Sequence, residues 1–244
     1  MPLGLSGWEL AAAMAIVLLG GMVQGAIGFG LNLMVVPILA LLAPGSVPGS
    51  MVLLSMPMTL TMLIREHHAI DWLGVRWIAI GRLPGTLAGV AIVAAVPDAE
   101  LALVVGIVII IGVGLSTFHP GFSVSRRSAG VTGVIAGVTG TAAGVDGPAL
   151  ALLYQHQEPH TLRATLAVCF LIGATVSGAA LAIGGELTLE QLALTALLLP
   201  AMLIGLALSG RVKGRLPLAS LRPVVLTFST IAGVIATVRG IAAL

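Results

Sequence analysis

Two glycine-rich segments interrupt the long apolar runs of this chain: QGAIGFG (24–30) and GTAAGVDGP (140–148). Gln24 and Asn32 flank the first segment, and their amides can hydrogen-bond an oxyanion. Gly28 and Gly30 lack a Cβ, so a ligand can approach the backbone closely there. These groups together suit a small anion. The alternative is that both amides cap a broken helix or bond a neighbouring helix.

The second segment offers hydroxyls, glycines and one carboxylate. Thr139 and Thr141 supply the hydroxyls, although membrane threonines often bond the carbonyl of their own helix instead. Gly140 and Gly144 again permit close backbone approach. Asp146 precedes a Gly-Pro pair, which favours the first turn of a helix, so its carboxylate can cap that helix. Alternatively, ionised Asp146 competes with a substrate anion for this positive helix end, and its protonation then couples a proton to the anion.

Arg82 is a basic residue about two turns inside a long apolar segment. Its guanidinium fork suits oxyanions, so it can supply the cation for an anionic ligand. Equally, its stem can lie in lipid while its head reaches the nearest aqueous interface. By contrast, we interpret Ser55, Thr59 and Ser177 as packing residues.

The composition requires that these residues be positioned by membrane helices. Apolar residues make up 58% of the 244 residues, charged residues only 8%, and the mean hydropathy is +1.15. A soluble domain carries roughly a quarter charged residues. The surface therefore faces lipid, where only helices or closed barrels satisfy their backbone hydrogen bonds. The apolar runs show no alternation of the barrel kind, which predicts an all-α membrane protein.

A membrane-spanning helix needs about 20 apolar residues. Six segments qualify as full spans: 48–65, 74–96, 100–118, 162–183, 189–210 and 220–240. The regions 8–43 and 129–155 are instead predicted to be hairpins broken at the glycine-rich segments. The second has arms of about a dozen residues, each about 18 Å long, so it must enter and leave on the same side. The first has a longer opening arm, 8–27, and either re-enters or crosses fully.

An internal repeat divides the chain into two halves. Three sets of residues recur in order: Gly21, Gly25 and Gly28 as Gly133, Gly137 and Gly140; Pro84 and Gly89 as Pro200 and Gly205; Pro97 and Leu101 as Pro217 and Leu221. We therefore expect one transmembrane domain, 1–244, made of repeats 8–118 and 129–240. Each repeat would contain a broken or re-entrant hairpin followed by three transmembrane helices.

The charges predict that the two repeats are inverted. Nine of the eleven basic residues fall in four loops: 65–76, 119–127, 156–163 and 211–222. The alternate loops carry Asp98, Glu100, Glu186 and Glu190 and no basic residue. Lys and Arg collect in cytoplasmic loops, so the basic loops share the cytoplasmic side, with Arg239 as an exception. This alternation holds only if each hairpin returns to the side that it left.

Inverted repeats with broken hairpins are typical of secondary transporters, whose half-helix ends face the substrate. Non-helical backbone at membrane depth must be buried or line a polar cavity. Free N–H groups at the start of each second arm favour an anion. The sequence thus predicts a transporter of small anions in the inner (cytoplasmic) membrane, working by alternating access.

A family resemblance sharpens this prediction. The paired segments 21–39 and 133–154, together with LPGTLAG (83–89) and RATLA (163–167), resemble the sulfite exporter TauE/SafE family over essentially the whole chain. The resemblance implies a small sulfur-containing anion such as sulfite, sulfoacetate, thiosulfate or another organosulfonate, bound at the two breaks. The family often has a glycine or another neutral residue where this chain has Asp146.

Other function classes fit less well. The alternative is an anion channel or passive pore, with the hairpins as a selectivity filter. No catalytic motif or cofactor fingerprint occurs, so we expect neither an enzyme nor a cofactor. His156 and His160 are four residues apart, but Pro159 interrupts a helix that would align them on a metal. The expected partners are the anion and the lipid bilayer, with no nucleic acid. GxxxG pairs allow a homodimer, although the same spacing serves packing within one chain.

Overall fold

The computed structural model describes residues 4–117, 123–213, 226–227, 229–235, 237–238 and 241. Within these ranges the chain is helical and contains no strand. The helices are α1 (Gly7–Ile27), α2 (Leu31–Leu42), the short 3-10 helix η2 (Pro44–Ser46), α3 (Gly49–Arg65), α4 (Trp72–Ala95), α5 (Asp98–Thr117), α6 (Arg126–Ala142), α7 (Gly147–Tyr154), α8 (Pro159–Gly184) and α9 (Leu189–Lys213). Ten of the 21 residues of the expected span 220–240 lie outside the described residues, and Arg239 is one of the ten.

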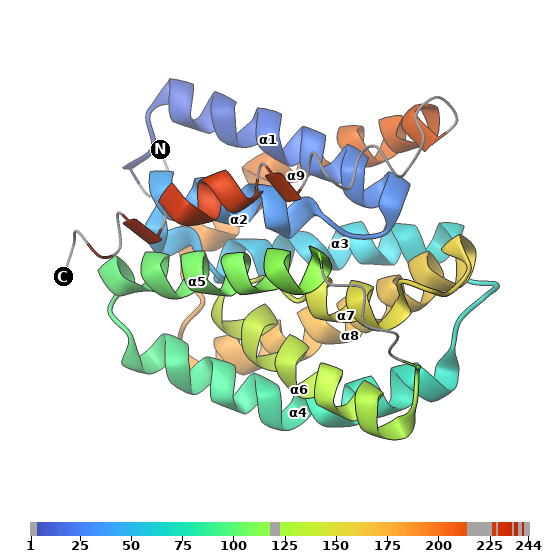
Figure 1. The fold of residues 1–244 in the computed structure, drawn as a ribbon. Coiled ribbons are helices and arrows are strands. Elements are labelled where there is room, and N and C mark those ends of the chain that lie inside the picture. Colours follow the sequence, from blue (N-terminus) through green and yellow to red (C-terminus); the bar gives the residue numbers. More distant parts are fainter. Residues whose placement is uncertain are drawn as a thin grey trace.

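The long helices run roughly alongside one another, across the view of Figure 1. Among the described residues, four helices are long and apolar enough to cross a membrane, namely α1, α4, α8 and α9. Large apolar side chains on their outer faces are open to the surroundings, for example Leu87 at 70% exposure and Ile183 at 89%. Such side chains are stable there only against lipid. The fold is that of a multi-pass membrane protein.

Local sequence sets where several helices begin. Ser6 and Glu9 form a capping box at the start of α1, with the Ser6 N–H donating to Glu9 Oε2 at 2.8 Å. Asp71 caps α4, because its Oδ1 accepts from the Gly74 N–H at 3.0 Å. Each cap satisfies backbone donors that the first helical turn leaves without partners.

Both breaks are shorter than the glycine-rich segments suggest. The first comprises only residues 28–30, because Gln24 to Ile27 complete α1. The second comprises residues 143–146, because α6 continues past Gly140 to Ala142 and α7 begins at Gly147. The expectation of two arms of about a dozen residues in the second hairpin was wrong: α6 has 17 residues and α7 has 8.

The backbone angles explain these boundaries. Gly28, Gly30 and Gly144 have positive φ values of 107°, 123° and 70°. Only glycine adopts such angles without strain, and a helix cannot continue through them. Glycines such as Gly140 have ordinary helical angles instead and serve close packing. Glycine content alone therefore did not locate the breaks.

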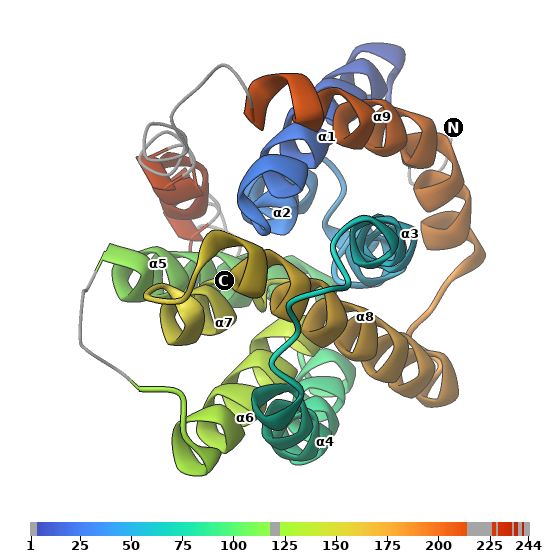
Figure 2. The ribbon, with the colours of Figure 1, turned by 90° about the vertical axis from the view of Figure 1, so that its right-hand side faces the viewer.

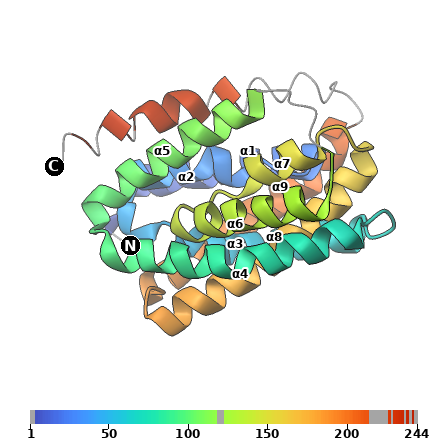
Figure 3. The same cartoon turned by 60° about the horizontal axis from the view of Figure 1, so that its bottom comes forward.

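Each hairpin starts and finishes at the same end of the bundle. In Figures 1 and 3, α1 begins and α2 finishes at the left, whereas α6 begins and α7 finishes at the right. The connection after α3 and the one before α8 lie at the right, and the connections after α4 and α8 lie at the left. The basic loops that the structure describes thus share one end, and the acidic loops share the other.

This arrangement predicts how cysteines will label from outside intact cells. In a Cys169→Ala background, cysteines at Pro97 and Glu186 should react with a membrane-impermeant maleimide, and those at His68 and Arg127 should not. The reason is that the basic end should face the cytoplasm. Permeabilised cells, in which all four positions should label, provide the control. Labelling of Pro97 and Glu186 from opposite sides would overturn the arrangement.

Glycines bring the helices into direct backbone contact. A Cβ on Gly85 would overlap the Val134 carbonyl of α6, and one on Gly205 would overlap the Leu18 carbonyl of α1. Accordingly α4 packs closely on α6, and α1 packs closely on α9. Figure 2, viewed roughly along the helices, shows these two pairs on opposite sides of α3 and α8. The GxxxG glycines are thus used in packing within one chain.

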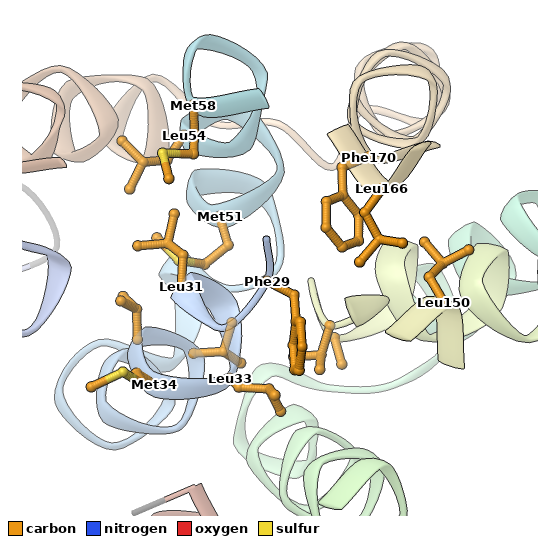
Figure 4. Packing of buried hydrophobic residues seen from close by; sticks show 14 of the residues in the cluster. Phe29, Leu31, Leu33, Met34, Met51, Leu54, Met58, Leu150, Leu166 and Phe170 are labelled. Carbon is orange, nitrogen blue, oxygen red and sulfur yellow. The ribbon is translucent and has the colours of Figure 1, made fainter. Parts of the chain in front are cut away.

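Apolar side chains fill the space around the two breaks. Leu31 and Leu33 of α2, Met51 of α3, Leu150 of α7 and Leu166 of α8 are buried there (Figure 4). Their burial makes the surroundings of both breaks mostly apolar. Polar groups that remain inside this core must therefore bond one another or a ligand.

Candidate functional site

A small cavity of about 30 Å³ lies between the two breaks. Since a water molecule needs roughly 10–15 Å³ of such volume, the cavity holds no more than a few water-sized groups. Seven of the ten residues predicted for a site line it: Gln24, Gly30, Asn32, Arg82, Gly140, Gly144 and Asp146. They come from α1, α2, α4, α6 and both breaks. Tertiary structure therefore brings most of the predicted residues together.

A buried ion pair occupies this cavity. Arg82 Nη1 donates to Asp146 Oδ2 at 2.8 Å, and the two side chains are 2% and 12% exposed. The interpretation that Arg82 reaches the aqueous interface was therefore wrong, because its head points into the protein. The interpretation of Asp146 as a cap was also wrong, since its side chain accepts no bond from the start of α7. In a low-dielectric interior the carboxylate gains more from a guanidinium than from a backbone N–H.

Two glycines make room for the guanidinium. A Cβ on Gly173 of α8 would overlap Arg82 Cζ and both terminal nitrogens, and a Cβ on Gly140 would lie 2.7 Å from Nη2. The head is therefore held between the α6 and α8 backbones. Among the residues that the structure describes, however, Arg82 Nε is buried without a hydrogen-bond partner, and so is Thr86 Oγ1 one turn further along α4. An unsatisfied buried donor is costly, and an oxyanion could accept from it.

Asn32 ties the two breaks together. Its Nδ2 donates to the Gly144 carbonyl at 2.6 Å and to Ser55 Oγ at 3.1 Å. Gln24 Oε1 accepts from the Leu31 N–H at 3.1 Å and so caps α2. Both amides therefore make the structural bonds that were the alternative to ligand binding, and both also line the cavity. A ligand would meet them already fixed in orientation.

Three predicted residues lie outside the cavity lining. Gly28 packs against the stem of Arg163, as described below. Thr139 Oγ1 donates to the Ile135 carbonyl of its own helix at 3.0 Å. Thr141 is fully buried and shares a hydrogen bond of 2.8 Å with Ser177 Oγ of α8. The hydroxyls therefore serve helix packing in this conformation.

The cavity also has a wall that the sequence did not indicate. Ser55 and Thr59 of α3 line it, as do Phe170 and Ser177 of α8. Ser55 and Thr59 are four residues apart and so share one helix face, which is the signal that could have identified them. Both hydroxyls donate to carbonyls within α3, at 2.7 Å each. Nothing in the sequence alone distinguished Ser177 from the other buried small residues.

Comparison with known proteins gives one match. The family model described as Sulfite exporter TauE/SafE matches residues 13–235, which is most of the chain. Searches of curated proteins and of solved structures gave no match.

Proposed function

We propose that this chain, which belongs to the sulfite exporter TauE/SafE family, carries a small sulfur-containing anion with Arg82 as its principal ligand. The family consists of membrane transporters rather than enzymes, and the apolar helices agree with that. Candidate substrates are sulfite, sulfoacetate, thiosulfate and other organosulfonates. Transport would run across the inner (cytoplasmic) membrane by alternating access.

The observation that carries this proposal is the buried pair of Arg82 and Asp146 beside the second break. A planar guanidinium matches the oxygen geometry of sulfite and sulfonate groups, which it can bind with two parallel hydrogen bonds. Nη1 is engaged by Asp146, and the unpartnered Nε leaves a donor for such an oxyanion. Gln24 and Asn32 add further polar groups to the lining of the cavity.

Asp146 would act as the counter-ion of Arg82 when no substrate is bound. An unpaired charge in this interior is strongly unfavourable, so the empty site needs the carboxylate. When an anion arrives, it competes with the carboxylate for the same guanidinium. Protonation of Asp146 removes that competition and leaves one negative charge opposite Arg82. We therefore expect a proton to accompany the anion.

The packing pattern supports the division into inverted repeats 8–118 and 129–240. By the repeat, α1 corresponds to α6, and α9 corresponds to α4. The closest helix pairs are α1 with α9 and α6 with α4, so exchanging the repeats reproduces the pairing. The pairing of α3 with α8 is likewise preserved. Such symmetry is what a carrier uses to present one site alternately to the two sides.

Substitution of Asp146 by asparagine tests the proton coupling. Wild-type flux of radiolabelled sulfite into proteoliposomes should rise as the pH falls, and the flux of Asp146→Asn should be nearly independent of pH. Asparagine has the size of the protonated acid but cannot ionise. Arg82 is the charged side chain that contacts Asp146 among the described residues.

Proteoliposome flux and planar-bilayer currents together distinguish a carrier from the alternative of a passive pore. A carrier should give saturable flux, whereas ohmic currents in planar bilayers would favour the pore. An unchanged pH dependence in Asp146→Asn would exclude coupling through this residue. Because sulfite itself titrates near neutral pH, the assay should be repeated with a sulfonate, whose charge is constant.

A further inference from the structure

We propose that Arg163 forms a second anion site, at the basic-loop end of the protein, through which the substrate passes between the central cavity and water. This inference rests on the proposed function and takes the same class of ligand, a small sulfur oxyanion. Four features support it: the ion pair of Arg163 with Glu66, the packing of Arg163 on Gly28, the cavity beside Arg163, and the phenylalanine side chains near it.

The charge pair resembles the one in the central site. Arg163 lies near the start of α8 and is only 2% exposed. Its Nε donates a hydrogen bond of 2.5 Å to Oε2 of Glu66, the residue that follows α3. Nη2 lies 3.3 Å from His160 Nδ1. As in the pair of Arg82 and Asp146, a buried guanidinium is balanced by one carboxylate from a different helix region.

Both arginines pack against equivalent glycines of the two hairpins. Gly28 and Gly140 correspond to each other in the internal repeat. A Cβ on Gly28 would lie 2.8 Å from Arg163 Cγ, and a Cβ on Gly140 would lie 2.7 Å from Arg82 Nη2. Each hairpin glycine thus admits one buried arginine.

Arg163 borders a cavity of about 170 Å³, larger than the central cavity of about 30 Å³. Its polar lining comes from Arg163 together with Gln155 and Gln157. Gln157 lies in the exposed loop between α7 and α8. The cavity therefore has room for an oxyanion and lies at the basic end of the molecule. Arg163 is the cation that would bind the oxyanion there.

One phenylalanine lines each of the two cavities. Phe29 lines the Arg163 cavity, and Phe170 lines the central cavity. A Cβ on Gly147 would lie 3.6 Å from Phe29 Cβ and 3.8 Å from Phe170 Cζ, so both side chains lie beside the start of α7. Figure 4 shows the two side chains entering the same space between α2 and α8. We expect an anion that moves from Arg82 to Arg163 to pass these two rings.

Side-specific kinetics test the inference. Uptake of radiolabelled sulfite should be measured from each side, in right-side-out and inside-out vesicles. In Arg163→Gln, and in the charge-balanced Arg163→Gln/Glu66→Gln, the half-saturating concentration from the basic end should rise roughly tenfold or more, as expected for loss of a charged hydrogen-bond donor. From the acidic end it should change little. The double variant guards against misfolding caused by losing the bond between Glu66 and Arg163.

Arg65→Gln is the matched control. It removes the same charge at the same end, but Arg65 donates to the Leu206 carbonyl and borders a different cavity. Its half-saturating concentrations should stay near wild type. Equal changes from both sides, or no change in either Arg163 variant, would overturn the second site while leaving the central site standing. If the wild type takes up no sulfur oxyanion, the proposed function itself fails.

Discussion

Replacing Arg82 by glutamine should lower sulfite flux by about two orders of magnitude. A hydrogen bond to a charged group contributes roughly 1.5–3 kcal/mol, and each 1.4 kcal/mol changes an equilibrium constant about tenfold. An oxyanion on Arg82 would lose at least one such bond, and with it the cation that balances its charge. Proteoliposome uptake at subsaturating sulfite measures the loss.

The same substitution should destabilise the protein, because it leaves the Asp146 carboxylate buried without its partner. Removing one partner of a buried ion pair typically lowers the free energy of unfolding by about 3–5 kcal/mol. The double variant Arg82→Gln/Asp146→Asn contains no unpaired charge, so its thermal unfolding in detergent should return toward wild type. Its flux should stay low, which separates folding from binding.

Arg82→Lys is the informative conservative variant. It keeps the positive charge but replaces the planar fork by a compact ammonium. We expect the protein to be stable and its flux to lie between those of wild type and Arg82→Gln. Flux near the wild-type level in Arg82→Gln/Asp146→Asn would disprove the proposed anion site.

Gly173→Ala should abolish most of the flux with a smaller effect on stability. The added methyl group would overlap the head of Arg82, which is held from its other sides by Asp146 and the Gly140 backbone. The overlapping atoms belong to the end of a side chain, so the guanidinium can move while the helices stay packed. Overpacking of this kind typically costs about 1–3 kcal/mol. The displaced head no longer faces the anion as in the wild type.

Gly130→Ala is the control for this substitution. Gly130 also lies in a helix, but a Cβ there meets no atom within 4 Å. Flux and thermal unfolding of Gly130→Ala should therefore match the wild type. Normal flux in Gly173→Ala would show that transport does not depend on the packing of the Arg82 guanidinium against Gly173.

The sequence correctly identified the class of protein and the elements that build it. A chain with so few charges cannot form a water-exposed surface, so membrane helices followed from composition. The family resemblance was confirmed by the match over residues 13–235. Helices α3, α4, α5, α8 and α9 start and finish within a few residues of the expected spans, because apolar length is a local property.

The breaks were located only approximately. Glycine has two uses in this protein, positive φ angles at Gly28, Gly30 and Gly144, and close backbone contact at positions such as Gly85. The residue type is the same in both roles, so the sequence does not distinguish them. Only the backbone path distinguishes them, which is why the arms of the second hairpin differ from the expected lengths.

The sequence by itself determined which residues are chemically suited to an anion, since residue type and apolar surroundings singled out Arg82 and Asp146. Only the tertiary structure decided what these side chains contact. The two residues are 64 positions apart, and the packing of α4 against α6 brings Arg82 within 2.8 Å of Asp146. A buried charge takes the best partner within reach, and that reach depends on how helices pack rather than on neighbours along the chain.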